Sequence, residues 1–150
     1  MIRVQREDFD PGVELEAMTR GKTHIGGVTS FTGLVRDMAG GTAITAMTLE
    51  HYPGMTEKQL AEIEAEAHRR WPLDAVLIIH RYGELKPGDR IVLVATASSH
   101  RDAAFDSCRF MIDWLKTKAP FWKLEATDAG SHWVEAKESD DAAADRWRQS

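Results

Sequence analysis

Five cationic residues are of the types that bind and transform anionic substrates. His100 and Arg101 stand at the start of a predicted helix, Lys116 near its end, Lys123 shortly after it, and Arg36 directly after a predicted strand. Arginine holds a phosphate with a two-pronged fork, and a partly desolvated lysine can have its pKa lowered toward about 7–8, where it acts as a base. The pattern favours a site for a phosphorylated substrate, although surface charge alone would also account for it.

The helix that must position these groups runs from about residue 99 to residue 119. Ser99 and Asp102 form a predicted capping box at its start, and Pro120 ends it. The free backbone N–H groups at a helix start favour an anion. Apolar residues recur at helical spacing and predict one buried face: Ala104, Cys108, Met111, Ile112 and Leu115. Aromatic residues among the lysines at the other end suggest a substrate with a ring: Trp114, Phe121 and Trp122.

Length and composition bound the class of protein. The chain has 150 residues, 43% of them hydrophobic and 29% charged, which favours one soluble domain over residues 1–150 with a polar tail or short helix from about residue 139. The formal net charge of −5 argues against a general nucleic-acid binder. No apolar run reaches the roughly 18 residues of a membrane span, and the N-terminus lacks an apolar signal segment. We therefore expect a cytoplasmic protein without a membrane or nucleic-acid partner.

Cysteine and histidine usage narrows the chemistry. Cys108 is the only cysteine, which excludes an intramolecular disulfide and a CxxC site, and its place on the apolar stripe predicts a buried structural thiol. Sulfur chemistry would therefore need its sulfur from outside the chain. The six histidines form no HExxH pair and no Walker A sequence is present, so we expect no metal and no cofactor. Ser98-Ser99-His100 is a weak candidate for a serine nucleophile, because adjacent side chains rarely face one another.

The remaining elements predict an α+β class with a largely antiparallel sheet, because strands and helices mix without regular βαβ alternation. Asp10-Pro11 predicts the start of a helix to residue 19, and Thr56 with Gln59 predicts a capped helix to about residue 71. Glycines at 26, 27 and 33 predict a bulge or a close backbone approach. The predicted strands are 2–5, 24–35 paired with 43–51 in a hairpin open at Arg36, 74–82, 90–98, and a final hairpin of 121–127 with 132–136.

Long segments of the chain resemble the catalytic large subunit of molybdopterin synthase. The resemblance covers nearly the whole chain in uninterrupted runs, which makes it far more specific than any short motif. The matching runs are FTGLVRD (31–37), LEHYPGMTEKQLAEI (49–63), RWPL (70–73), IHRYGEL (79–85), SSHRDAAF (98–105), DWLKTKAPFWKLEAT (113–127) and WVEAKESD (133–140).

The resemblance implies an α/β-hammerhead fold with an additional small antiparallel sheet. It implies a homodimer that binds a small ubiquitin-like sulfur-carrier subunit at each end, forming a heterotetramer. The family converts cyclic pyranopterin monophosphate to molybdopterin with sulfur from the carrier's C-terminal Gly-Gly thiocarboxylate. Its essential lysines fall on Lys116 and Lys123, and its substrate contacts fall on Arg36, His100 and Arg101, with Phe31 nearby. A further contact falls on position 137, where Lys137 replaces the arginine common in the family.

Two other functions remain open from the sequence. One is a non-catalytic module that docks a ubiquitin-like protein, and the other is a phosphoesterase acting on a sugar or nucleotide phosphate. The two lysines, the His100-Arg101 pair and Arg36 favour the sulfurtransferase, because docking alone would not need an anion pocket. The sequence does not indicate which lysine acts as the base.

Overall fold

The strands form a layered structure with helices on both faces. The computed structural model describes residues 1–39, 41–128, 130–134 and 138–148, and within these ranges the strands form two sheets. In the first sheet β1 pairs in parallel with β5, whereas β5–β7 and β7–β2 are antiparallel. Its order is β1 (Ile2–Gln5), β5 (Ala75–Arg81), β7 (Arg90–Ser98) and β2 (Gly27–Leu34).

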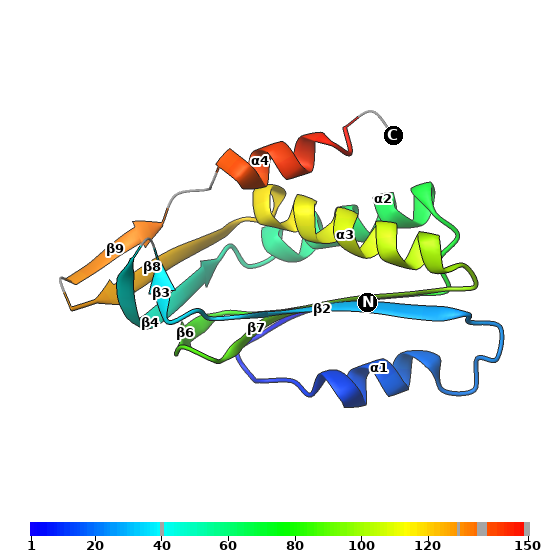
Figure 1. Ribbon diagram of the computed structural model, residues 1–150, viewed down its shortest axis with the longest axis horizontal. Helices are drawn as coiled ribbons and strands as arrows, with labels where there is room; N and C mark the ends of the chain where they lie inside the picture. The colour runs from blue at the N-terminus through cyan, green and yellow to red at the C-terminus, as the bar shows by residue number, and fades with distance from the viewer. Residues whose placement is uncertain (40, 129, 135–137, 149–150) are drawn as a thin grey trace.

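The helices divide between the two faces of this sheet. Figure 1 shows α1 (Pro11–Thr19) on one face, and α2 (Met55–Arg70) with α3 (Arg101–Lys118) on the other. Helix α4 (Glu138–Asp145) lies over α3 in the same view. No helix within the described ranges is both long enough and apolar enough to cross a membrane.

The core follows from the period of two along the central strands. Val76, Ile78, Val92 and Val94 pack against α2 and α3, in a cluster with Leu60, Phe110 and Met111. The alternate residues of the same strands pack beside α1: Leu77, Ile79, Leu93, Ala95 and Ala97, with Phe9 and Met18. Because both faces of β5 and β7 are buried, these strands read as continuous apolar runs.

The second sheet stands at one end of the first (Figure 1). Its strands are antiparallel, and β8 turns directly into β9. The order is β3 (Met38–Ala39), β4 (Thr42–His51), β8 (Phe121–Thr127) and β9 (Gly130–Val134), with β6 (Gly83–Leu85) also paired to β4. The α+β class with a further antiparallel sheet is confirmed, as is the final hairpin.

The predicted hairpin between residues 24–35 and 43–51 is wrong. Strand β2 pairs with β7, with Phe31 opposite Val94, whereas β4 pairs with β8, with Leu49 opposite Lys123. The chain therefore crosses from one sheet to the other near Arg36. Sequence neighbours did not become sheet neighbours because β7 and β8, far along the chain, supply the backbone hydrogen-bond partners of β2 and β4. Strand β6 was not predicted.

Both predicted capping boxes are misplaced. Helix α3 begins after His100, and its preceding turn is held by Ser98, whose Oγ accepts the His100 N–H (3.1 Å) and donates to the Pro72 carbonyl (2.8 Å). Helix α2 begins after Gly54, whose N–H donates to Glu57 Oε2 (2.8 Å). The buried Thr56 instead donates to the Pro120 carbonyl (3.2 Å), which ties the start of α2 to the end of α3. The cap at Asp10 is confirmed.

The predicted close approach by another backbone is confirmed at Gly26, which directly precedes β2, whereas Gly27 is open and Gly33 meets a side chain. A Cβ at Gly26 would collide with the Ser99 carbonyl oxygen, and one at Gly33 would lie 2.8 Å from a Val92 methyl group. The register of β2 against β7 also shifts between Gly33 and Leu34, as expected of a bulge. The contact of Gly26 with Ser99 holds the start of β2 close to the turn that leads into α3.

Candidate active site

Lys116 and Lys123 face a common cavity where the second sheet meets the first. Its volume is about 130 Å³, and its walls include His80, Phe121 and Leu49. A larger neighbouring cavity of about 470 Å³ is lined by both lysines together with Arg36 and Phe31. The structure thus brings together four residues that the sequence singled out as site residues.

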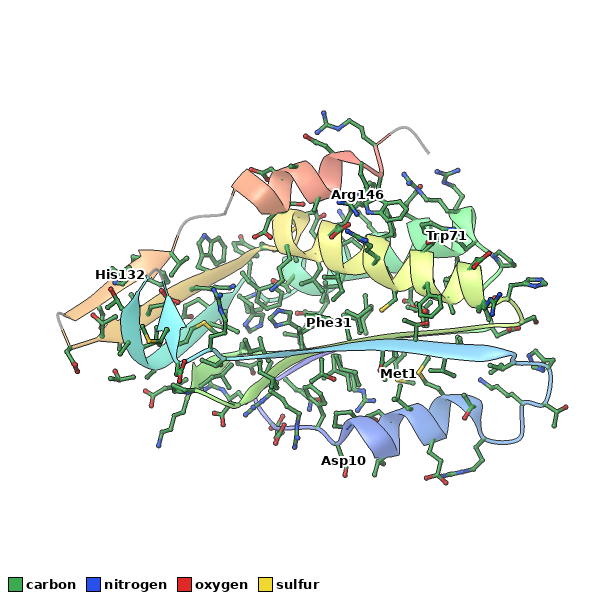
Figure 2. The ribbon with its side chains drawn as sticks, in the orientation of Figure 1. Met1, Asp10, Phe31, Trp71, His132 and Arg146 are labelled. Atoms are coloured by element: carbon green, nitrogen blue, oxygen red, sulfur yellow. The ribbon has the colours of Figure 1, made fainter. Side chains whose placement is uncertain are left out.

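Each of these groups comes from a different element. Lys116 is on the last turn of α3, and Pro120 then turns the chain into β8. On β8, Lys123 and Phe121 lie two residues apart and so share one face of the strand. Arg36 follows β2, and Phe31 lies on β2 near the middle of the molecule, as Figure 2 shows. The site depends on the tertiary contact between the two sheets.

His80 is a wall residue of the smaller cavity that sequence reasoning missed. Its side chain is 5% exposed, and its ring stacks on Phe121 with centroids 3.7 Å apart and planes 16° apart. Nδ1 lies 2.8 Å from the Arg81 carbonyl oxygen. Burial lowers the pKa of His80 to about 3, helped by the positive charges of Lys116 and Lys123, although the bond to Arg81 opposes the shift. One signal was available: a histidine ends the apolar run of β5.

Two carboxylates line the same region and were also missed. Glu125, buried on β8, and Asp140, on α4, both line the larger cavity, and Asp140 lines the smaller one as well. His132 Nε2 lies 3.6 Å from Glu125 Oε1, toward the outer end of the second sheet (Figure 2). The lysines therefore stand beside negative as well as positive groups. Among the described residues no cluster of His, Cys, Asp and Glu could hold a metal ion.

Two further predicted contacts, His100 and Arg101, are elsewhere. His100 and Arg101 lie at the opposite end of α3 from Lys116, and fifteen residues of helix span about 22 Å. Neither lines the two cavities. Lys137 lies outside the described residues. Within one chain, the five cations of the sequence hypothesis do not form one site.

Cys108 is shielded, as the sequence predicted. Its side chain is 4% exposed within the core, and its Sγ points at the Val94 carbonyl oxygen, 3.7 Å away. Burial raises the pKa of the thiol to about 12. A neutral, buried thiol is a poor nucleophile, so a sulfur carried on this residue is disfavoured.

Comparison with known proteins identifies the family of the chain. The MoaE protein family matches residues 4–118 of the chain. The chain belongs to the MoaE family. A relative in Pseudomonas aeruginosa, named "Molybdopterin synthase catalytic subunit", is 55% identical over 148 residues, which are 99% of each chain.

Solved structures extend the match to the fold. The MoaE protein from Burkholderia ambifaria superposes with a TM-score of 0.84 at 53% identity, covering 98% of this chain and 97% of that one. A more distant structure from Helicobacter pylori, named "Protein-protein complex of subunit 1 and 2 of Molybdopterin-converting factor", has a TM-score of 0.73 at 19% identity. It covers 91% of this MoaE chain and 90% of its own, and shares the fold.

Proposed function

We propose that this chain is the catalytic subunit of a molybdopterin synthase, which converts cyclic pyranopterin monophosphate to molybdopterin. The sulfur comes from the C-terminal Gly-Gly thiocarboxylate of a small ubiquitin-like partner. The observation that carries the proposal is the shared cavity of Lys116 and Lys123, with Arg36 and Phe31 in the adjoining space. An enzyme that binds a phosphorylated substrate and the carrier's acyl group needs cationic side chains at the place where the two meet.

The cavity residues suit the steps of sulfur transfer. Arg36 can hold the substrate phosphate with charge-assisted hydrogen bonds, and Phe31 can lie against the pterin ring. Once the sulfur has bonded to the substrate, water replaces it on the carrier's acyl carbon, and Lys116 and Lys123 stabilise the oxyanion that this attack forms. The walls formed by Phe121 and His80 limit hydrolysis of the thiocarboxylate before the transfer. Because Cys108 is buried with a raised pKa, a sulfur donor outside the chain fits the structure.

The partner subunit belongs to the proposal. The Helicobacter pylori structure is described as a complex of two subunits, and at 19% identity its likeness to this chain extends to the fold. A tail of four extended residues reaches about 13 Å, far enough to thread from a subunit surface into the cavity. Terminal glycines would pass a narrow channel because they carry no side chain.

A homodimer would bring His100 and Arg101 of one copy to the Lys116 cavity of the other. These residues are too far from Lys116 in their own chain, so they contact substrate only at the site of a second copy. Strand β2 is an edge of the first sheet and exposes Val28, Phe31 and Leu34, and Phe105 of α3 is 60% exposed. Such apolar surface on an edge strand favours pairing with another chain. The role of Lys137 and the cytoplasmic location remain predictions.

A reconstituted reaction tests the proposal. The protein is mixed with a thiocarboxylated carrier and cyclic pyranopterin monophosphate, and the dithiolene product is measured. We expect product with the thiocarboxylated carrier and none with the carboxylate form. Tight binding of the carrier without any product would instead favour the alternative, a docking module without chemistry.

A further inference from the structure

We infer that His80 is a positioning residue of the site, whose Nε2 accepts a hydrogen bond from the Lys116 ammonium group across the smaller cavity. Both residues line that cavity, and His80 comes from β5 of the first sheet whereas Lys116 comes from α3. For its effect on turnover, the inference rests on the catalytic role proposed for Lys116. The contact itself is tested separately below.

The hydrogen bond to the backbone decides the tautomer of His80. A carbonyl oxygen can only accept, so the Nδ1 atom 2.8 Å from the Arg81 oxygen carries the proton. In a neutral imidazole the other nitrogen then holds a lone pair and accepts. The stacked Phe121 ring fixes the plane of the imidazole, because the two planes differ by only 16°. The acceptor nitrogen is thus held in a set direction.

The surroundings keep the imidazole neutral. Burial lowers the pKa of His80 to about 3, and the charges of Lys116, Lys123 and His51 contribute to this shift. The Asp140 carboxylate also lines the cavity, from α4. At neutral pH His80 therefore stays neutral and its Nε2 remains an acceptor. A charged imidazole would be repelled by both lysines.

A neutral acceptor has an advantage over a carboxylate at this place. It orients an ammonium group without cancelling its charge, so the full positive charge of Lys116 stays available for an anionic acyl group. An ammonium group has three N–H donors, so a bond to His80 leaves two for substrate and other partners. Lys116 stands on a flexible four-carbon stem at a helix end, where orientation has to be supplied by a neighbour.

Two amide substitutions at His80 test the Nε2 acceptor separately from the hydrogen bond between Nδ1 and the Arg81 carbonyl. In His80→Asn the amide nitrogen takes the place of Nδ1 and can still donate to the Arg81 carbonyl, but no acceptor occupies the Nε2 position. In His80→Gln the amide oxygen reaches the Nε2 position. We expect kcat to fall about ten- to a hundredfold in His80→Asn with little change in KM, and to recover most of its value in His80→Gln.

Lysine titration measures the contact without the reaction. Lysine side chains labelled with ¹³C at Cε are followed by NMR, and the Lys116 signal is assigned by its loss in Lys116→Arg. A hydrogen bond from the ammonium group stabilises the charged form and raises the lysine pKa. The Lys116 pKa should therefore be lower in His80→Asn than in the wild type, by about one unit, and restored in His80→Gln.

The wild-type imidazole gives a measurement that needs no His80 variant. The ¹⁵N shift of Nε2 should be that of an unprotonated acceptor between pH 5 and 8, and it should move in Lys116→Met. An unchanged Nε2 shift, or an equal Lys116 pKa in all His80 variants, would overturn the inference even if Lys116→Ala abolishes turnover. Conversely, a shifted lysine pKa with wild-type turnover in Lys116→Ala would confirm the contact and refute the proposed role of the lysine.

Discussion

Lys116 and Lys123 reach one cavity from a helix end and a strand, and this convergence distinguishes them from the other lysines within the described ranges. Lys118 is two residues from Lys116 but lies over the Trp114 ring, with Nζ 5.0 Å from the ring centroid. It does not line either cavity. The two lysines of α3 therefore form a matched pair for testing position against charge.

Lys116→Ala should lower turnover by about 10²–10³-fold, the usual cost of removing one group that stabilises developing negative charge, while the protein stays folded and still binds its carrier. Dithiolene formation under single-turnover conditions measures the loss. Lys118→Ala is the control and should keep nearly full activity, since it loses only a cation–π contact. Equal activity in the two variants would remove Lys116 from the mechanism.

Cys108→Ser should retain most sulfur transfer, because its hydroxyl can donate to the Val94 carbonyl as the thiol does. The pKa of about 12 keeps the wild-type thiol protonated at pH 8, so the folded protein should also resist alkylation there. Mass spectrometry after iodoacetamide treatment, with and without denaturant, measures this protection. A folded Cys108→Ser protein without sulfur transfer would indicate a persulfide route through Cys108.

At the scale of elements, the junction of β2 with the start of α3 depends on Gly26. Its N–H donates to the Ser98 carbonyl (2.9 Å), and its Cα faces the Ser99 backbone too closely for a side chain. The neighbouring Gly27 is open, with Arg101 Cα 3.9 Å from the place of a Cβ. A side chain should therefore fit at Gly27 but not at Gly26.

Gly26→Ala should destabilise the protein by about 1–3 kcal/mol, because backbone must move to admit the methyl group. Gly27→Ala should change the free energy of unfolding far less. Denaturant unfolding of both variants measures the difference. If the two variants are equally stable, the close approach at Gly26 does not constrain the fold.

The end of α2 carries an ion-pair network whose contribution depends on pH. Arg69 and Arg70 donate to the Glu66 carboxylate and lower its pKa from 4.5 to about 2. Arg70 also donates to the Trp147 carbonyl oxygen (2.6 Å) and lies over the Phe110 ring. The network thus links α2, α3 and the residues after α4.

Since the folded-state pKa of Glu66 is depressed, its pairing stabilises the fold above about pH 4.5, and this stabilisation is lost as the pH falls toward 2. Allowing for solvent screening, the contribution should be about 1 kcal/mol. Glu66→Gln should flatten the pH dependence of the unfolding free energy in this window. Glu62→Gln, which removes an exposed carboxylate of the same helix outside this network, is the matched control variant.

At the scale of the whole molecule, the two groups of residues proposed to form one anion site lie at opposite ends of α3 in a single chain. Lys116 and Arg36 belong to one end, and His100 with Arg101 belong to the other. A two-fold dimer can place the second group of one copy beside the first group of the other. The assembly would then have two composite sites.

Complementation tests this arrangement. Lys116→Ala and the double variant His100→Ala, Arg101→Ala should each be nearly inactive alone. Mixed heterodimers contain one intact composite site, so an equilibrated equal mixture should regain roughly a quarter of wild-type activity. No recovery, together with a monomer in sedimentation, would place His100 and Arg101 outside the site.

Features with local causes could be predicted from the amino-acid sequence. The helical period of α3 predicted the burial of Cys108, Asp10-Pro11 predicted the start of α1, and the glycines of β2 predicted a close approach. The signals for these features lie in short segments of the sequence, because residue spacing and backbone freedom carry them, although other elements supply the contacts. The uninterrupted family segments pointed to Lys116, Lys123, Arg36 and Phe31, but not to how they meet.

Strand pairing and the surroundings of each polar group depend on contacts between elements that are distant in sequence. The partner of β2 is β7 rather than β4, although β4 lies much nearer to β2 along the chain. His80 is an ordinary histidine in the sequence, and it becomes a neutral acceptor only where β5, α3 and β8 enclose it. The separation of His100 from Lys116 likewise follows from a straight helix of 18 residues, whose length sets the distance between groups at its ends.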